Sequence, residues 1–467
     1  MPVNLAAPLT WKTANTDESA MLADLQANIL KGHGRNHTAN LFLRFTGPVA
    51  GVKSFIHRLG HDVTSARQQL EDTEKFKLSG IPGPMTVCFY LTFKGYTVLA
   101  VPPPKVPADV RWKAGMAASG AALVDPAPST WDLFTPGDVH AMLLLADISA
   151  ENVANEVARL AGNGTPTDPG ILARHGISIV GDIRGIARRN AKGDGIENFG
   201  YVDGRSQPLL LVEDVDAEPG PGTSWNPTFP LSQVLIPDPG NASPNAFGSY
   251  FVFRKLEQNT KMFGIQEDKL STQLGLMTLT GGSAPERGGA LAVGRFRDGT
   301  PVVLTGADGV GPHNNDFNYA SDPSPGVHCP VRGHIRKTNP RDGSERPRIM
   351  ARRGITYGDR KIDPDTKEFL DANTVTGGVG LLFAAFMRDI ASMFEFTQQT
   401  WANNINFPAP NAGLDPVIGQ GTNPAGAIGW KDGWGTGAVT NFDFHGAVTL
   451  KGGEYFYAPP RSFLGTV

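Results

Sequence analysis

The stretch VHAMLLLADISAENVANEVARLAG, residues 139–162, indicates the fold class of this chain of 467 residues. Residues 139–148 are almost all apolar, and their number suits a buried strand. Residues 151–162 carry the spaced apolar side chains of an amphipathic helix. A strand that leads directly into a helix predicts a fold that mixes the two kinds of element.

The segments around this stretch extend the pattern. A predicted strand, a predicted helix and a second predicted strand precede it, at 39–45, 52–70 and 84–93, and another strand follows at 176–185. The order strand, helix, strand, strand, helix, strand is that of the ferredoxin-like split βαβ unit. We therefore expect an antiparallel sheet with helices packed against it.

The second half of the chain repeats this order less cleanly. Its expected strands are 249–258, 348–353, 379–388 and 454–459, and its expected helices are 261–275 and 390–402. A connection rich in Gly, Pro, Asp and Asn, about residues 191–245, separates the halves, and a loop of that length is usually functional or a linker. The sequence therefore predicts two α+β domains, 1–195 and 196–467, with the chemistry at and after the join.

Bulk properties exclude several classes of protein. With 40% hydrophobic and 19% charged residues the chain is expected to form a packed core, and its net charge of −3 does not favour a nucleic-acid or membrane partner. No run of 18 apolar residues and no secretory signal pattern is present, so we expect a cytoplasmic protein, with export by a leaderless route left open. Cys88 and Cys329 are too few for a disulfide framework, and neither lies in a CxxCH haem-attachment motif.

Three clusters could carry chemistry. The first, GDGIENFGYVDGRSQP (193–208), places Asp203 between glycines that allow a tight turn, although an Asp-Gly pair is most often only a turn. The second, HCPVRGHIRKTNPR (328–341), surrounds His334 with Arg and Lys, which suits a dianionic ligand such as haem or a phosphate but also describes a solvated basic loop. In the third, 376–408, an apolar strand ends at Asp389, which is a candidate site residue or an ordinary helix cap.

Other common sites are not indicated. The sequence contains no GxxxxGK[ST], HExxH or GxSxG motif. TGGVG at 376–380 lacks the strand, helix and later acid of a dinucleotide site. The three clusters are thus the remaining candidates.

Together the clusters resemble segments of the dye-decolourising peroxidases. The pattern GxxDG at 200–204 resembles that family's signature, HIRKTNPR at 334–341 the segment of its proximal histidine, and ARRGITYG at 351–358 the segment of its distal arginine. Further segments that are similar to the family extend the resemblance over most of the chain: LQANILKGHG (25–34), GRFRDGTP (294–301), NDFNYASD (315–322), GLLF (380–383) and QTWANNINFP (399–408).

The resemblance implies a fold, a cofactor and an activity. It implies two ferredoxin-like α+β domains with one non-covalent haem b, held chiefly by the C-terminal domain. It implies a peroxidase that uses hydrogen peroxide to oxidise phenols and aromatic dyes through an oxoferryl intermediate. A haem-handling protein of the same fold with little turnover is the alternative, and a phosphate-binding protein is a third hypothesis that leaves the GxxDG match unexplained.

The resemblance also assigns residues. His334 takes the place of the iron ligand, Asp203 that of the distal acid and base, and Arg352 that of the stabiliser of negative charge. Arg352 is preferred to Arg353 because alternate strand residues face opposite ways and the family's arginine comes first in RRG, and the HIRKT match favours His334 over His328.

Secondary roles follow with less support from the residues. Asp389 is the candidate carboxylate behind the proximal histidine, Arg336 a candidate partner of a haem propionate, and Leu381 and Phe383 candidate walls of the distal pocket. Tyr357 and Trp401 match positions that relatives use to oxidise bulky dyes at the surface, or else they are packing aromatics.

Overall fold

The ten strands of one sheet organise the part of the chain that the structure describes. The computed structural model describes residues 2–467 except 166, 219–221, 279–283, 321, 323–325 and 425–428. The sheet runs in the order β4-β1-β3-β2-β12-β6-β9-β7, with β5 (Ile236–Pro237) paired to β6 and β8 (Ile355–Tyr357) paired to β9. Two ferredoxin-like halves therefore lie edge to edge in a single sheet.

The first half contains the predicted elements. Its strands are β1 (His37–Phe45), β2 (Thr86–Leu91), β3 (Ala141–Asp147) and β4 (Ile177–Ile186), all paired antiparallel. The expected helix 151–162 is α7 (Ala150–Ala161). The single helix expected at 52–70 is instead two helices, α2 (Val49–Asp62) and α3 (Ala66–Ser79), because the Ser65 side chain accepts the Gln68 N–H at 3.1 Å and starts a new helix.

The second half repeats the strand order with differences. Its strands are β6 (Phe247–Gln258), β7 (Ala351–Arg352), β9 (Gly380–Met387) and β12 (Val448–Ala458), and its helix is α10 (Thr260–Gln273). The strand expected at 348–353 is only two residues long. The helix expected at 390–402 has π-helical hydrogen bonding in Ala391–Glu395 and Thr397–Ala402. The domain boundary at 195/196 stays a prediction.

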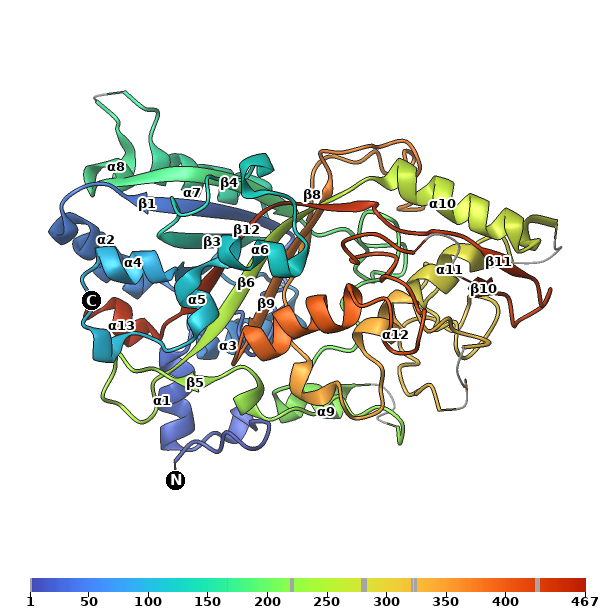
Figure 1. Ribbon diagram of the computed structural model, residues 1–467. Coiled ribbons are helices and arrows are strands. Elements are labelled where there is room, and N and C mark those ends of the chain that lie inside the picture. The colour runs from blue at the N-terminus through green and yellow to red at the C-terminus, as the bar shows by residue number, and fades with distance from the viewer. Residues whose placement is uncertain are drawn as a thin grey trace.

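The remaining α-helices and strands are short, with nine residues or fewer each. They are α1 (Thr16–Asp24), α4 (Phe93–Val98), α5 (Val110–Ala114), α6 (Met116–Leu123), α8 (Gly170–Arg174), α9 (Val212–Ala217), α11 (Arg287–Val293), α12 (His334–Thr338), α13 (Arg461–Leu464), β10 (Gly429–Lys431) and β11 (Val439–Asn441). Figure 1 shows α10, α11, α12 and the β10–β11 hairpin gathered on the side away from β1 and β4, among long loops. Within the described residues, no helix is long and apolar enough to cross a membrane.

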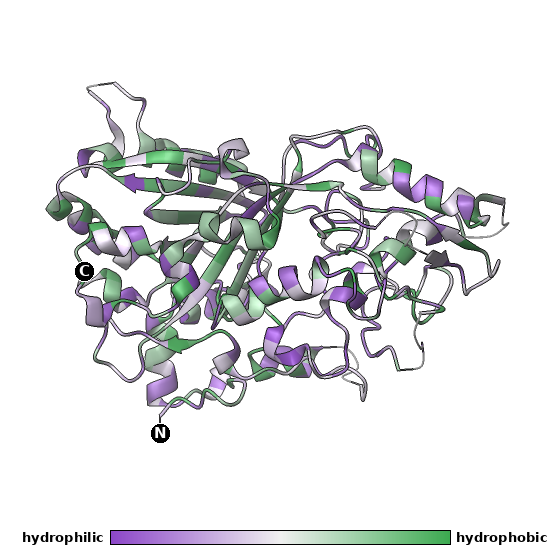
Figure 2. Cartoon of the chain, viewed as in Figure 1, coloured by the Kyte–Doolittle hydropathy of each residue, from purple (hydrophilic) through white to green (hydrophobic). Residues whose placement is uncertain are grey.

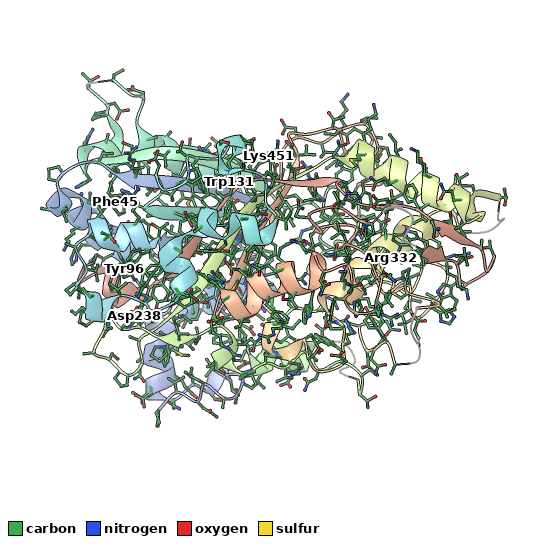
Figure 3. All side chains as sticks on the ribbon, viewed as in Figure 1. Phe45, Tyr96, Trp131, Asp238, Arg332 and Lys451 are labelled. Atoms are coloured by element: carbon green, nitrogen blue, oxygen red, sulfur yellow. The ribbon has the colours of Figure 1, made fainter. Side chains whose placement is uncertain are left out.

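Both faces of the central strands are buried, which explains the long apolar runs in β1, β2 and β3, whereas the outer strand β4 is only partly buried. In β1, Leu41 and Leu43 belong to one apolar cluster and Phe42 to another, because successive side chains point to opposite faces. Figure 2 shows the hydrophobic residues concentrated on these strands and the helices beside them. Phe45 and Tyr96, labelled in Figure 3, lie in the first cluster.

The junction of the halves depends on a buried glutamine. Strands β2 and β12 are paired at Leu91 and Tyr457. Beside this pair the Gln26 amide donates to the Phe89 and Pro459 carbonyls at 2.8 Å each and accepts the Phe89 N–H at 2.8 Å. Gln26 is fully buried, so these bonds are shielded from water. One side chain of the N-terminal segment thus fastens the first half of the sheet to the second.

The two halves also contact each other between β4, at one end of the sheet, and β8, which pairs with β9. The Thr356 hydroxyl in β8 donates to the Ile186 carbonyl in β4, and the Arg188 guanidinium donates to the Gly358 carbonyl at 2.5 Å. The two halves of the sheet are therefore joined at two places, at the β2–β12 pair and between β4 and β8. The loops that follow β4 and β8 consequently begin close together.

We expect Gln26→Ala to lower the free energy of unfolding by about 2–4 kcal/mol, since three hydrogen bonds are lost and their buried partners are left unsatisfied. Urea unfolding followed by fluorescence measures the change. The exposed Gln68 of α3 provides the control, and Gln68→Ala should shift stability by no more than about 0.5 kcal/mol. Equal effects of the two substitutions would show that the hydrogen bonds of Gln26 do not stabilise the junction.

Candidate functional site

A cavity of about 470 Å³ lies between the sheet and the loops. Its walls include five of the seven residues expected to bind a cofactor or act in catalysis: Asp203, His334, Arg352, Leu381 and Phe383. They come from four segments of the sequence: the connection after β4, helix α12, strand β7 and strand β9. The volume is within the range of about 300–1,000 Å³ of ligand pockets.

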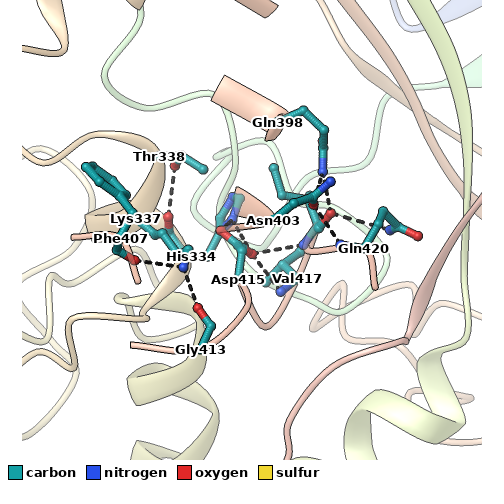
Figure 4. A network of polar contacts seen from close by, with 11 residues as sticks. His334, Lys337, Thr338, Gln398, Asn403, Phe407, Gly413, Asp415, Val417 and Gln420 are labelled. Atoms are coloured by element: carbon teal, nitrogen blue, oxygen red, sulfur yellow. Dashed lines mark hydrogen bonds and ion pairs between the residues drawn. The ribbon is translucent and has the colours of Figure 1, made fainter. Parts of the chain in front are cut away.

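His334 is the first residue of α12, and a carboxylate fixes its ring. Its Nδ1–H donates to both oxygens of Asp415, at 2.9 and 3.1 Å, as Figure 4 shows. Burial lowers the pKa of His334, but the carboxylate raises it by more, so that its net pKa lies above the ordinary value. With Nδ1 occupied, Nε2 is the ring nitrogen left to bind a ligand in the cavity.

Asp415 is fully buried and rigidly held. Its Oδ1 also accepts the N–H groups of Val417 and Ile418 at 2.8 and 2.9 Å. Burial raises the pKa of Asp415, but the ring of His334 and these N–H groups lower it further, so that the net pKa lies below the ordinary value and the carboxylate stays ionised. Such a carboxylate orients a ligating histidine and makes it more basic.

The prediction that Asp389 supports the histidine is wrong. Its carboxylate accepts the Ser392 N–H at 2.6 Å at the start of the helical segment after β9, and it is not part of the cavity wall. Asp389 therefore behaves as a helix cap, which was the alternative. It follows Leu381 and Phe383 along the chain, but β9 carries it away from them.

Asp203 lies in a loop that another buried acid shapes. Its N–H donates to the Gly195 carbonyl at 3.0 Å, and its Oδ1 accepts the Gly204 N–H at 2.6 Å. Upstream, the Glu197 carboxylate accepts the N–H groups of Phe199 and Tyr201 at 2.8 and 3.0 Å. Burial raises the pKa of Glu197 to about 7, although these N–H groups lower it. The loop thus presents an accessible Asp203 from a rigid backbone.

The two adjacent arginines have different contacts. Arg352 donates from its guanidinium to the Arg205 carbonyl at 2.5 Å, the only such bond to the described part of the chain. Arg353 donates to the carbonyls of Asn28, Ile29 and Arg352 at 2.7 to 2.8 Å. Both border the cavity, yet only Arg352 keeps most of its N–H groups for a ligand.

The predicted propionate partner Arg336 does not reach the cavity. Its guanidinium donates to the Asp322 carboxylate at 2.9 Å and the Cys329 carbonyl at 2.6 Å, and it lies over the Tyr319 ring. That assignment is wrong, because Arg336 points from α12 into the loop before it. Arg295 and Arg341 do line the cavity, and burial lowers the pKa of these groups to about 9 and 10.

The two aromatics expected to act at the surface are buried. Tyr357 and Trp401 are each 3% exposed, so neither presents its ring to a bulky dye. Tyr357 belongs to an apolar cluster on the sheet, and Trp401 stacks on Phe407 at 5.4 Å between ring centroids. Both rings therefore have the burial that the packing alternative describes, and a part for either in electron transfer stays a prediction.

The cavity fits the haem that the resemblance implies. It provides one imidazole braced by a carboxylate, apolar walls including Leu381 and Phe383, and arginines that can balance two carboxylates. In the described residues no group of three or more His, Cys, Asp or Glu is arranged to hold a metal ion. A site with one ligand suits a metal whose other ligands come from a macrocycle.

Two structurally important acids, Asp415 and Glu197, were not predicted. Asp415 stands alone in the apolar segment Leu414–Ile418, with a proline after it and glycines around it. An acid in such a loop can accept the backbone N–H groups of the residues two and three positions later. A single Asp in this setting is therefore a sequence signal for a turn closed by a buried carboxylate. Its partnership with His334, 81 positions earlier, has no signal in one sequence.

Comparison with known proteins gives a consistent set of relatives. No protein-family model matches the chain. The multifunctional dye peroxidase DyP2 of Amycolatopsis sp. is 43% identical over 99% of both chains, and its solved structure superposes with a TM-score of 0.88, covering 100% of both. The structure of a DyP-type peroxidase of Anabaena sp. is 34% identical with a TM-score of 0.86, covering 99% and 98%. A dye-decolorizing peroxidase of Mycena epipterygia is 30% identical over 75% of this chain and 70% of its own.

We expect Asp415→Asn to weaken the binding of haemin by about 10–100-fold, because the ring of His334 loses the carboxylate that orients it. Titration of the apoprotein with haemin, followed by absorption, measures the dissociation constant. Asp389→Asn is the matched control and should leave that constant unchanged. If Asp389→Asn weakened haemin binding more than Asp415→Asn does, Asp389 and not Asp415 would be the carboxylate that supports His334.

Proposed function

The chain belongs to the dye-decolourising peroxidase family, and on that premise we propose that Asp203, Arg352 and His334 form the active site of a haem peroxidase. Hydrogen peroxide is the oxidant, and phenols and aromatic dyes are the electron donors. Haem is the cofactor of this enzyme; we propose that it is haem b, bound non-covalently, one per chain. In support, His334 is a single unshared ligand, and both cysteines are buried away from any attachment motif.

One observation carries the proposal: a braced imidazole and an acid–arginine pair border the same cavity. The electrostatic influence of both Arg352 and Asp203 reaches His334, the former lowering and the latter raising its pKa. A haem-handling protein needs the imidazole but neither of the other two groups. The combination therefore favours catalysis over storage of the cofactor.

The cofactor side of the site consists of His334 and Asp415. His334 would hold the iron through Nε2, while Asp415 takes the hydrogen bond from Nδ1 and makes the ring a stronger electron donor. Arg295 and Arg341 are two of the cavity arginines, and their positive charges would balance the propionates. When bound, haem supplies the redox chemistry of peroxide reduction and donor oxidation.

On the peroxide side, Asp203 moves the proton. In its ionised form the carboxylate accepts the proton of bound hydrogen peroxide and returns it to the oxygen that departs as water. Its Oδ1 is held by the Gly204 N–H, so that Oδ2 is the oxygen left to exchange the proton. The glycines at 200 and 204 have φ of 94° and 80°, a conformation that holds the loop in this shape.

Arg352 stabilises negative charge. Its bond to the Arg205 carbonyl holds the guanidinium beside the loop of Asp203 and leaves other N–H groups to donate to the peroxide anion. A cation placed before the reaction needs no reorganisation when charge develops. Leu381 and Phe383 line the same cavity with apolar side chains, and a less polar surrounding strengthens such an electrostatic interaction.

The test of the function is direct. The protein reconstituted with haemin should turn over a phenolic donor and an anthraquinone dye only when hydrogen peroxide is present. His334→Ala should lose the haem absorption band, and His328→Ala should retain it. Haem binding without peroxide-dependent turnover would favour the haem-handling alternative.

We expect Asp203→Asn to slow the reaction with peroxide by about 10²–10⁴-fold, because the amide keeps the size of the carboxylate but cannot carry the proton. Stopped-flow absorption measures the second-order rate constant, with haem content as a check on the fold. Asp194→Asn, in the same loop but outside the cavity wall, should react at the wild-type rate. Near-wild-type reaction of Asp203→Asn across pH 4 to 7 would leave Asp203 only a turn residue.

Arg352→Leu should slow the same step by about 10²–10³-fold, the usual cost of losing one preorganised donor. Arg352→Lys keeps the charge but not the planar fork and should recover part of the rate. The measurement is again the second-order rate constant for hydrogen peroxide. If Leu and Lys variants react equally, the charge of Arg352 plays no part in the step.

A further inference from the structure

An N-terminal loop, Asn28–Arg35, forms part of the cavity wall. Asn28, Gly32, His33, Gly34 and Arg35 all border the cavity, although α1 and β1 on either side of the loop are remote from the chemistry in sequence. The loop belongs to the segment LQANILKGHG, which resembles the family but has no role in the mechanism above.

Side chains from elsewhere hold this loop in one shape. The Gln69 amide in α3 donates to the carbonyls of Lys31 and Gly32 at 2.9 Å each and accepts the Asn28 N–H at 2.7 Å. Arg353 donates to the Asn28 carbonyl at 2.7 Å. Asn28 itself has φ of 71°, a conformation that non-glycine residues seldom adopt. These contacts make the loop a rigid wall of the cavity.

The ring of His33 has a defined orientation and protonation. Its backbone N–H donates to the Asn28 side chain at 3.1 Å, and its Nδ1 accepts the Arg35 N–H at 3.0 Å. Burial lowers the pKa of His33 to about 4, with help from the positive charges of Arg35 and Arg353. The ring is therefore neutral above pH 5 and carries its proton on Nε2, which no described residue accepts.

His33 borders the cavity at a point where the loop reaches the protein surface. Gly32 and Gly34 beside it are exposed, and a side chain at Gly34 would meet open space. Arg353, which holds the loop, is the neighbour of Arg352, which holds the loop of Asp203. Between the two glycines the imidazole of His33 is the large side chain, and Arg35 follows it in the cavity wall at this rim.

We propose that His33 is a specificity-determining residue that filters the oxidant at the cavity rim, admitting hydrogen peroxide and excluding branched alkyl hydroperoxides. The inference rests on the proposed peroxidase function. The ring narrows the opening, and its Nε2–H offers a hydrogen bond to a small oxygen-bearing molecule that passes. Because Gln69 and Arg353 hold the loop, the width of the opening depends on the size of the side chain at this position.

Three variants of the haem-loaded protein test the filter, with tert-butyl hydroperoxide as the bulky probe. His33→Ala should raise the rate constant for this probe, relative to that for hydrogen peroxide, by about 10–100-fold, a usual range for discrimination by pocket size. His33→Gln keeps a side chain of similar length with N–H donors and should retain the wild-type ratio. His37→Ala, at the start of β1 and outside the cavity wall, is the matched control and should also retain it.

A second variant, His33→Trp, and a second probe, cyanide, test the filter even if His33→Ala does not fold. The larger ring should slow both the reaction with hydrogen peroxide and the binding of cyanide to the resting enzyme by about tenfold or more, by the same size discrimination. Cyanide binding is followed by the absorption change and needs no turnover. An unchanged ratio in a folded His33→Ala protein, or unchanged cyanide binding in His33→Trp, overturns the filter.

The outcomes separate this inference from the proposed function. If the wild-type protein binds haem but never turns over donors with peroxide, the proposed function fails, while the cyanide rates still test the filter. If the wild-type protein turns over donors and the peroxide ratio does not respond to the side chain at 33, only the filter fails.

Discussion

Two adjacent arginines at the end of β7 connect the cavity to the sheet. Because successive residues of an extended chain point in opposite directions, Arg353 reaches the N-terminal loop at Asn28 and Ile29, while Arg352 reaches the loop of Asp203 at Arg205. Burial lowers the pKa of Arg353 to about 10, because desolvation is unfavourable for the charged guanidinium. Hydrogen bonds to carbonyls offset that cost, and both walls of the cavity depend on this short strand.

The sheet itself leaves little room for chemistry. Its two faces are largely filled by separate apolar clusters, so Asp203 comes from a loop, His334 from α12, and Arg352 from the end of the short strand β7. The loops at the site are made rigid by buried acids that accept backbone N–H groups, Glu197 before Asp203 and Asp415 beside His334. A buried carboxylate is costly unless such donors satisfy it, which explains why each one is surrounded by its own loop.

The corrected assignments share one cause. Asp389 and Arg336 are both close in sequence to residues of the site, yet each interacts with a neighbouring segment: Asp389 caps a helix and Arg336 pairs with Asp322. Tyr357 and Trp401 were assigned to the surface, but both pack into apolar surroundings. Distance along a chain is a poor guide here, because one strand or one helical turn reverses the direction of a side chain.

The sequence by itself indicated the succession of most strands and helices along the chain, the family, and the three residues proposed for the active site. Apolar runs of strand length report burial directly, and the motifs around Asp203, His334 and Arg352 are local, so a single chain is sufficient to find them. Only the tertiary structure decided that Asp415 supports His334, that Gln26 fastens the two half-sheets, and that the loop of His33 borders the cavity. Each of these contacts joins segments from 63 to 433 positions apart, as for Gln26 with Phe89 and Pro459, and the hydrogen bonds that select such partners exist only after the chain has folded.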